Sequence, residues 1–545
     1  MKRIFILVSI FSALGCAGNS PAPLLTERIG VRSEIRTLSP IEAALMNAKS
    51  EPELSAEGKA IIQDLPQAQV QAPAALTGSK ALPADPSREP AAEQSRVPAQ
   101  DDAAAATATA NAEKDEDDED SDIATDTPVT HEEIEGDRSL TATRPWRAPD
   151  YSNQAGAMGW SETAFAVPKG LETNVQFWVD IYSKYTTDQG VLHDTESIDL
   201  IYGVLDFTSI SSRADLNPFQ RERMKIKMVK QGKKDVIALL GKLEKTNDPS
   251  TLTPDEKKIW DYFQKIEGRK KFRDAMSKSR LRFQLGQKDR IVQGIFFSGR
   301  YLEDFERIFH EGGLPIELAR LPFVESSFNV LARSKVGASG LWQIMRYTGR
   351  PYMMINNSID KRNHPNEATK IAVKLMRNNF QMLQSWPLAM TGWNHGPSGV
   401  LKLTKLYKSR ELGDLIQSRG LRRRLGFASR NFFASFLAVL EVEKNAPKYY
   451  GNAQWSQPLD EKDVFLPRPI KYDQVLRWFD GDDHKAQIFN PHITTQARKN
   501  RLDLPKGALI SVPRSKESEV LQDLASTPEP QKKSKGHKGA ASRTR

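Results

Sequence analysis

The sequence predicts a mainly α protein in which a folded body follows a long disordered segment. Apolar residues recur at helix-like spacing from about residue 170 to residue 445, and period-two alternation is rare. Residues 19–145 are instead rich in Ala, Pro, Ser, Thr, Asp and Glu and contain almost no aromatic side chains. Such a segment cannot bury enough apolar surface to offset its chain entropy, so we expect it to be disordered. The folded mass is expected between about residue 150 and residue 515.

The N-terminus has the organisation of an export signal. A basic start precedes the apolar residues 4–14 and then Cys16, the only cysteine, which predicts a signal peptide over residues 1–15 and excludes an internal disulfide. The apolar run is too short for a permanent transmembrane helix. The four residues ending at Cys16 resemble a bacterial lipoprotein box, with Ala13 where Leu is usual. This resemblance implies lipidation of Cys16 and a periplasmic lipoprotein anchored to the outer membrane. An ordinary signal peptide is the alternative.

The charge of the chain is unevenly distributed. Residues 16–150 are expected to form a disordered tether, and within it residues 113–137 hold thirteen acids and one Lys. Because the whole chain carries +9, the rest of it is strongly basic. A basic body suits an anionic partner such as a cell wall, an anionic membrane surface or a nucleic acid.

Residues 151–289 are expected to form an extra helical region without recognisable chemistry. Apolar side chains recur at helical spacing over residues 175–182 and 236–243. Thr253 followed by Pro254 and two acidic residues predicts the start of a helix, because Thr caps well and Pro suits the first helical position.

The most informative segment begins with a glutamate at the end of an apolar, helix-like run. Ser334 follows Glu325 after nine residues, Gln343 after eighteen and Met345 after twenty. This spacing resembles the catalytic domain of the family 1 lytic transglycosylases, the soluble lytic transglycosylase domain with a lysozyme-like fold. Within that family it is most similar to the membrane-bound lytic murein transglycosylase D group. The resemblance implies a catalytic domain over residues 290–450 that cuts the glycan strands of bacterial peptidoglycan.

Two later segments carry the same resemblance and also depart from it. Trp393, Asn394 and Gly396 fall on the family's Ala-Tyr-Asn-x-Gly motif, with Trp in place of Tyr. Phe432 stands where the family has a Tyr whose hydroxyl points at the catalytic Glu. Because both departures remove a hydroxyl, we expect the tuning of Glu325 to differ from that in the family.

The chemistry requires a proton donor at the leaving oxygen. A Glu serves at neutral pH if burial raises its pKa, and the apolar neighbours of Glu325 in the sequence favour burial. No second carboxylate occupies a recognisable position: we expect Glu317 to be a helix-face neighbour and Asp360 to be a loop or cap residue. The family resemblance implies a different route, in which Glu325 acts alone and the product ends in 1,6-anhydromuramic acid.

The resemblance also implies substrate-binding roles for the other matched residues. Ser334 would donate a hydrogen bond to the carboxylate or to the N-acetyl group, and Gln343 would offer a donor and an acceptor to the sugar. Met345 would form an adaptable apolar wall. The remaining candidates for substrate binding are Trp393, Asn394 and Phe432.

The C-terminal part of the chain changes pattern again. Within residues 451–515, Val464–Pro467 predicts a short strand and Tyr472–Phe479 a helix. An Asn-Pro-His-Ile sequence followed by residues 504–513 resembles the second half of a LysM glycan-binding module, whose usual opening is missing. A LysM-like module and a structural cap are therefore both open. Residues 516–545 predict a basic, disordered tail.

The sequence shows no zinc-ligand spacing, no phosphate-binding loop and no nucleophile elbow. We expect no metal and no cofactor, peptidoglycan strands rather than a nucleic acid as the partner, and cell-wall or division proteins as unidentified further partners. Two alternatives remain open. One is a lysozyme-type hydrolase of peptidoglycan, and the other is a non-catalytic, cell-wall-binding scaffold with a degenerate site.

Overall fold

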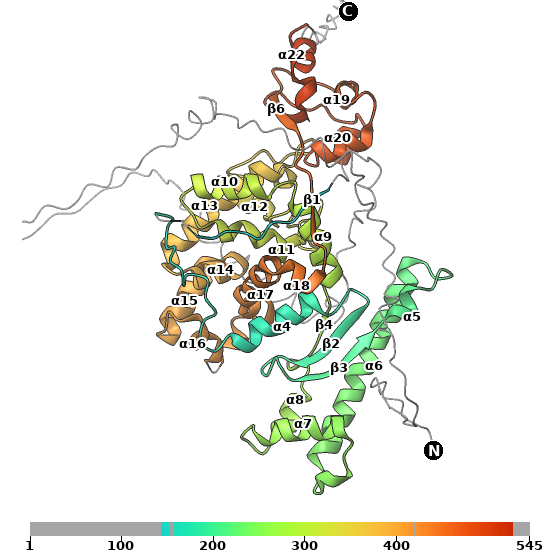
Figure 1. Cartoon of the computed structure of the whole chain (residues 1–545), viewed down its shortest axis with the longest axis vertical. Coiled ribbons are helices and arrows are strands. Elements are labelled where there is room, and N and C mark those ends of the chain that lie inside the picture. The colour runs from blue at the N-terminus through green and yellow to red at the C-terminus, as the bar shows by residue number, and fades with distance from the viewer. Residues whose placement is uncertain (1–142, 153, 155, 419, 527–545) are drawn as a thin grey trace, which may run out of the picture. The chain divides into compact units, whose positions relative to one another are not determined.

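The computed structural model describes residues 143–526, except residues 153, 155 and 419. Helices dominate this part of the chain, and its strands are short (Figure 1). The mainly α class predicted from the sequence is confirmed. The expected signal peptide, the lipidation at Cys16, almost all of the expected tether and the last nineteen residues lie outside the described residues. No helix in the described part is long and apolar enough to cross a membrane.

The first described residues belong to the folded body and not to the tether. Strand β1 (Thr143–Pro145) pairs antiparallel with β5 (Gln454–Ser456), more than three hundred residues later in the chain. The indole nitrogen of Trp386 donates a hydrogen bond to the carbonyl of Met158 at 3.0 Å. The prediction of a tether up to residue 150 was therefore wrong at its C-terminal end.

A three-stranded antiparallel sheet interrupts the region that was expected to be helical. Its order is β3 (Ile201–Asp206), β2 (Gln189–Asp194), β4 (Leu281–Leu285). Strand β2 is buried over almost its whole length, so it lacks the polar–apolar alternation that reveals a strand. Strand β4 does alternate between buried and half-buried residues, as its sequence Leu-Arg-Phe-Gln-Leu does. That alternation was the feature of the sequence that could have indicated a strand in this region.

A helical arm follows β3. Its long helix α6 (Pro218–Glu244) starts with a reciprocal cap between Asn217 and Gln220, and α7 (Pro254–Gln264) starts with the same arrangement between Thr253 and Glu256. The predicted helix start at Thr253 is confirmed. The arm also contains α5 (Thr208–Ser211), η2 (Pro249–Thr251) and α8 (Lys271–Ala275), and it packs on the sheet around its own apolar cluster.

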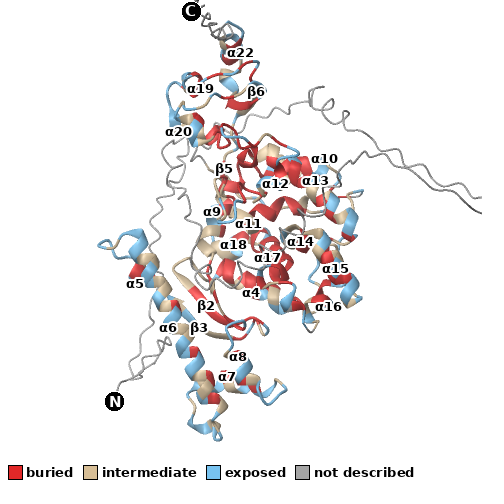
Figure 2. Cartoon of the chain, turned by 180° about the vertical axis from the view of Figure 1, so that it is seen from behind, coloured by how far each residue is buried: buried red, intermediate tan, exposed pale blue. Residues whose placement is uncertain are grey.

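The central lobe is built around helix α17 (Phe427–Lys444), which is buried on all sides. It packs against α4 (Glu172–Ser183), α14 (Trp386–His395) and the short α11 (Leu321–Ser326). Figure 2 shows the buried residues concentrated in these central helices, with exposed residues along α6. The other helices of the lobe are α9 (Lys288–Ser298), α10 (Leu302–Glu311), η3 (Ile316–Arg320), α12 (Arg346–Gly349), η4 (Lys361–Asn363), α13 (Pro365–Leu383), α15 (Pro397–Tyr407), α16 (Leu412–Gln417), η5 (Leu421–Arg423) and α18 (Ala446–Tyr450).

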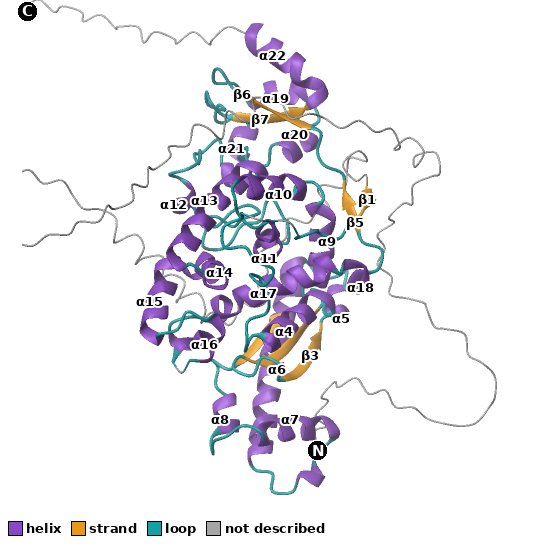
Figure 3. Cartoon of the chain, turned by 60° about the vertical axis from the view of Figure 1, so that its left-hand side comes forward, coloured by secondary structure: helices purple, strands orange, loops and turns teal. Residues whose placement is uncertain are grey.

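A C-terminal segment with its own apolar cluster follows the lobe. Strands β6 (Glu461–Phe465) and β7 (Leu509–Pro513) pair antiparallel and enclose three helices in sequence (Figure 3). The predicted strand near Val464 and the predicted helix from Tyr472 are confirmed. These helices are α19 (Tyr472–Trp478), α20 (Asp483–Phe489) and α21 (Thr495–Arg498).

Residues 517–526, which were expected to belong to the disordered tail, form a helix. After the turn η6 (Arg514–Lys516), helix α22 (Glu517–Ser526) buries Val520 and Leu524 against the C-terminal segment. The carboxylate of Asp523 accepts 2.8 Å hydrogen bonds from the side chains of Gln474 and Trp478. Residues 517–526 contain three acids and no Lys or Arg, and the two buried apolar residues with this polar contact explain why this polar stretch is helical.

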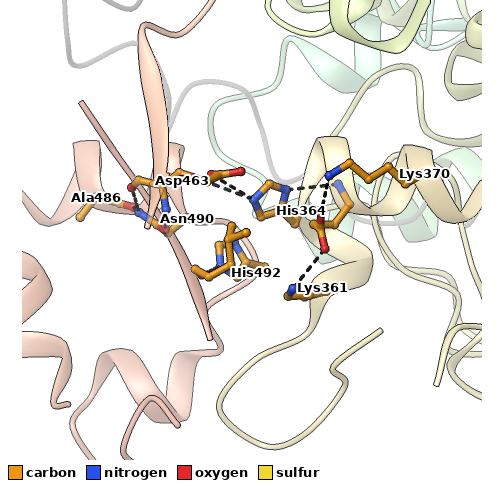
Figure 4. Close-up of polar contacts among 10 residues, drawn as sticks. Lys361, His364, Lys370, Asp463, Ala486, Asn490 and His492 are labelled. Carbon is orange, nitrogen blue, oxygen red and sulfur yellow. Dashed lines mark hydrogen bonds and ion pairs between the residues drawn. The ribbon is translucent and has the colours of Figure 1, made fainter. Parts of the chain in front are cut away.

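The C-terminal segment docks on the central lobe through His364, the residue that caps α13 (Figure 4). Its Nδ1 accepts from the backbone N–H of Glu367, which leaves Nε2 to carry the proton in the neutral ring. Nε2 lies 3.7 Å from Oδ1 of Asp463 on β6 and 3.4 Å from the hydroxyl of Ser511 on β7. A backbone hydrogen bond from Asp360 to the carbonyl of His492 adds a main-chain link between the two parts.

Candidate active site

Glu325 lies in the last turn of α11, directly before a sharp change of chain direction. Ser327 and Phe328 both have positive φ, 50° and 58°, a conformation that ends a right-handed helix. The hydroxyl of Ser326 donates to the carbonyls of Pro322 at 3.0 Å and Leu341 at 2.9 Å. These hydrogen bonds hold the C-terminal end of α11 against the loop that carries the other motif residues.

The carboxyl group of Glu325 is surrounded by packed protein although the residue keeps some exposed surface. Burial raises its pKa to about 8, and a hydrogen bond from Trp393 opposes this rise. The indole Nε1 of Trp393 donates to Oε1 of Glu325 at 2.8 Å. Trp342 in turn packs edge-on against Trp393, with ring centroids 6.3 Å apart. The indole thus supplies the donor that the sequence comparison had counted as lost with the tyrosine hydroxyl.

Tyr182 on α4 is a residue near Glu325 that the sequence did not reveal. Burial raises its pKa, a hydrogen bond with Ser435 lowers it, and the charge of Glu325 raises it again. The side chain is almost fully buried. Only its helical spacing was visible in the sequence, because it precedes the motif by more than a hundred residues.

Ser334 and Gln343 both hold the loop that follows α11. The hydroxyl of Ser334 accepts from the backbone N–H of Ala338 at 2.9 Å. Gln343 has a positive φ of 44°, and its Nε2 donates to the carbonyls of Gly340 at 2.8 Å and Ala332 at 3.2 Å. In the described part of the chain, both side chains make these loop contacts, and neither is hydrogen-bonded to Glu325. The hydroxyl proton of Ser334 and the amide oxygen of Gln343 remain available to a ligand.

Asn394 and Phe432 lie where α14 meets α17. Oδ1 of Asn394 accepts from the hydroxyl of Ser429 at 2.6 Å. Gly396, with φ of 92°, forms the corner between α14 and α15. Phe432 is only 5% exposed and belongs to the apolar core.

A cavity of about 910 Å³ opens beside this loop. It is lined by residues from 333–339 and 345–351 and by Arg362, and so includes Ser334 and Met345. Glu325 is not part of its lining. The structure therefore places Ser334 and Met345 together at one cavity, and Glu325 of α11 with Trp393 of α14 outside its lining.

The other two carboxylates considered in the sequence have structural partners. Asp360 caps η4 and pairs with Arg362 at 2.7 Å, as its expected cap role requires. Glu317 is not the helix-face neighbour that we expected, because it is buried and accepts from Gln154 at 2.9 Å and from Trp160 at 3.4 Å. Both donors precede α4 in the chain, so the sequence pattern around Glu317 does not reveal these hydrogen bonds.

Among the described residues, no group of three or more His, Cys, Asp or Glu side chains is arranged to hold a metal ion.

Comparison with known proteins gives a family match for part of the chain. Residues 309–415 match the family model described as the transglycosylase SLT domain. The matched range contains Glu325, Ser334, Gln343, Met345 and the Trp-Asn pair, and the family resemblance read from the sequence is confirmed over this range.

Two curated relatives extend the similarity beyond the SLT domain. The chain is 30% identical over 218 residues to the membrane-bound lytic murein transglycosylase D of Escherichia coli strain K12, covering 39% of this chain and 46% of that protein. The same figures hold for the protein of that name in Escherichia coli O6:H1. The chain thus spans a little under half the length of the curated relatives that it matches.

Proposed function

We propose that the chain is a peptidoglycan lytic transglycosylase in which Glu325 is the catalytic acid and base. The observation that carries this proposal is a half-buried Glu in the range that matches the SLT domain, whose pKa is raised to about 8 by burial of its carboxyl group and whose hydrogen-bond partner is an indole donor. A carboxyl group with this pKa is protonated at neutral pH and is ready to act as an acid. The curated relatives bear the name of the same activity.

The proposed reaction uses one carboxyl group twice. Glu325 gives its proton to the oxygen between N-acetylmuramic acid and N-acetylglucosamine, and that bond breaks. The 2-acetamido oxygen of the substrate stabilises the sugar cation, and the Glu325 carboxylate then removes the proton of the 6-hydroxyl. The 6-oxygen closes a 1,6-anhydro ring, so no water is consumed. In this scheme the Trp393 indole stabilises the carboxylate that exists between the two steps.

The positions of Glu317 and Asp360 favour this scheme over a lysozyme-type hydrolase. Retaining and inverting hydrolysis both need a second carboxylate that flanks the scissile bond. Both candidates are occupied by structural partners in the fold. The remaining alternative, a wall-binding scaffold, rested on the loss of two hydroxyls, and Trp393 replaces one of them as a donor.

Product analysis on purified sacculi tests the proposal. We expect muropeptides lighter by one water than hydrolysis products, which is the mass of the anhydro end. Products that all carry the added water would support the hydrolase instead. Binding to sacculi without any release of fragments would support the scaffold.

We also propose that Cys16 is lipidated and that the acyl chains anchor the protein to the outer membrane on the periplasmic side. The support is the lone cysteine after a short apolar run and the words "membrane-bound" in the relatives' name. Cys16→Ser should release the protein from the membrane fraction without loss of activity. A wild-type protein that fractionates as soluble and carries no acyl groups would contradict this.

A further inference from the structure

The cavity beside the site is unusual in its charge. Four of its lining residues are arginines, Arg333, Arg346, Arg350 and Arg362, and no acidic residue lines it. We call it the arginine cavity. Its volume of about 910 Å³ is in the range of sites that enclose a small ligand.

One of the four arginines is already neutralised. Arg362 donates through Nε and Nη2 to the two carboxylate oxygens of Asp360 at 2.9 and 2.7 Å. Its Nη1 donates to the carbonyls of Gly337 at 2.8 Å and Ile344 at 3.0 Å. Arg362 therefore shapes the cavity wall, and its charge is balanced within the protein.

The other three arginines are exposed and carry uncompensated charge. Among the described residues, none of the ion pairs involves Arg333, Arg346 or Arg350, and Arg346 makes only a long 3.5 Å contact with the carbonyl of Ile355. Three guanidinium groups around one concave surface raise the local concentration of anions. Their planar, two-pronged donors suit carboxylates and phosphates better than they suit neutral sugar hydroxyls.

The neighbourhood of the cavity identifies the carboxylate source. Ser334 and Met345, two residues that the SLT resemblance assigns to substrate, line the same cavity. Tyr347 and Val336 also line it and are 56% and 52% exposed, which gives apolar surface for small side chains beside the charges. A glycan built from N-acetylated sugars is almost neutral while the lactyl groups of its muramic acid are bound to peptide stems as amides. The stems that branch from it carry free carboxylates and alanine methyl groups.

We propose that the arginine cavity binds the free carboxylates of the peptide stems, so that glycan with free stem carboxylates is preferred over glycan whose stem carboxylates are amidated. This rests on the proposed function only in taking peptidoglycan as the substrate. Arg333, Arg346 and Arg350 are the specificity-determining residues, and Arg362 holds the wall between them.

The test compares sacculi with the same sacculi after their stem carboxylates have been converted to amides, because removing the stems with an amidase would free a lactyl carboxylate on each muramic acid. For the wild type we expect kcat/KM to be at least about tenfold higher on the sacculi with free carboxylates, since charge-assisted hydrogen bonds of this kind are each worth about a factor of ten or more. The triple variant Arg333→Gln, Arg346→Gln, Arg350→Gln should bring the ratio between the two substrates close to one. An unchanged ratio in that variant would overturn the proposal.

A matched control separates the cavity from net charge. Arg223→Gln, Lys227→Gln and Lys234→Gln remove the same three charges from exposed positions on α6. This control should keep the wild-type ratio. If it lowers the ratio as much as the cavity variant does, the preference comes from net charge and the proposal fails.

A binding measurement covers the case in which the protein shows no turnover. A synthetic stem tetrapeptide with free carboxylates should bind the full chain at least about tenfold more tightly than its fully amidated form, and the triple variant should lose this difference. Binding without turnover would overturn the proposed function and keep the cavity assignment. If the triple variant loses binding to anionic phospholipid vesicles while the two tetrapeptides bind equally, the cavity recognises phosphate and the proposal is wrong.

Discussion

Glu325 shows what can and cannot be read from a motif at the scale of one residue. Its identity and its need for a raised pKa followed from the spacing of the motif and from its apolar neighbours. The partner that tunes the pKa of Glu325 could not be read from the motif, because in the sequence Trp393 appears only as the replacement of a tyrosine. An indole N–H and a phenol O–H are both single donors, so either serves a carboxylate when the ring is placed correctly.

Glu325→Gln is expected to lower the rate of sacculus digestion by about 10⁴ or more, since one group serves both proton transfers. It should also stabilise the fold. The folded-state pKa of about 8 lies above the ordinary 4.5, so keeping this group buried costs stability once the pH exceeds 4.5, and the cost grows up to pH 8. Thermal unfolding should show no difference at pH 4 and a variant more stable by roughly 1–3 kcal/mol at pH 7.

Glu317→Gln is the matched control for this result. It should leave digestion near the wild-type rate and lower stability by about 1 kcal/mol, because one of its two donors loses an acceptor. The catalytic assignment would be wrong if Glu325→Gln digested sacculi as fast as the wild type.

Trp393→Phe is expected to move the alkaline limb of the kcat/KM profile to higher pH. The wild-type limb should lie near pH 8, because Glu325 must start protonated. The indole hydrogen bond lowers the pKa of Glu325, so its removal raises that pKa further. Trp160→Phe removes an indole donor from the buried Glu317 instead and should leave the limb in place. A limb that does not move in Trp393→Phe would show that the bond does not tune the acid.

At the scale of elements, the sequence predicted what depends on local signals. The start of α7 follows from Thr253 and Pro254, and the strand near Val464 and helix α19 follow from short patterns with clear breaks. The buried strand β2 was missed because a strand covered on both faces has no alternation to display. Helix α22 was missed because two buried residues, Val520 and Leu524, were enough to order a polar segment.

The C-terminal segment has two paired strands that enclose three helices, and its docking through His364 suits a cap. We propose that capping dominates, and Asp463 provides the test. Burial would raise its pKa, but the hydrogen bond and charge of His364, with the hydroxyl of Ser511, bring the pKa to about 2. Because this value lies below the ordinary 3.8, the carboxylate contributes stability above about pH 4 and loses it as the pH falls toward 2.

Asp463→Asn should therefore lower the stability of the chain at pH 7 by roughly 1 kcal/mol, after allowance for solvent screening of a side chain that is 35% exposed. The difference from the wild type should disappear near pH 2. Asp460→Asn is the control, because Asp460 is 77% exposed and pairs only with Arg514. Unfolding curves for Asp463→Asn that match the wild type at pH 7 would show that this contact does not hold the cap.

For the molecule as a whole, the catalytic unit is larger than the motif that identifies it. The sequence placed a boundary at residue 290 because the helical pattern before it carried no recognisable chemistry. In the fold, α4 packs along the buried helix α17, and Tyr182 reaches the surroundings of Glu325. Contacts between residues far apart in the chain leave no trace in local periodicity, so this extension was not predictable from one sequence.

A chain trimmed to residues 290–450 should consequently fail to fold stably, whereas residues 143–526 should unfold cooperatively. The shorter piece loses α4 and so exposes one side of α17, and it also loses β1 and both partners of Glu317. It would leave Arg320 without its contact to the ring of Tyr151, 5.1 Å away, and would uncover apolar side chains from the main cluster. Exposing a core helix costs more than the few kcal/mol by which a domain of this size is stable. Circular dichroism melts and limited proteolysis of the two pieces check this, and equal melting temperatures would show that the N-terminal residues are dispensable to the lobe.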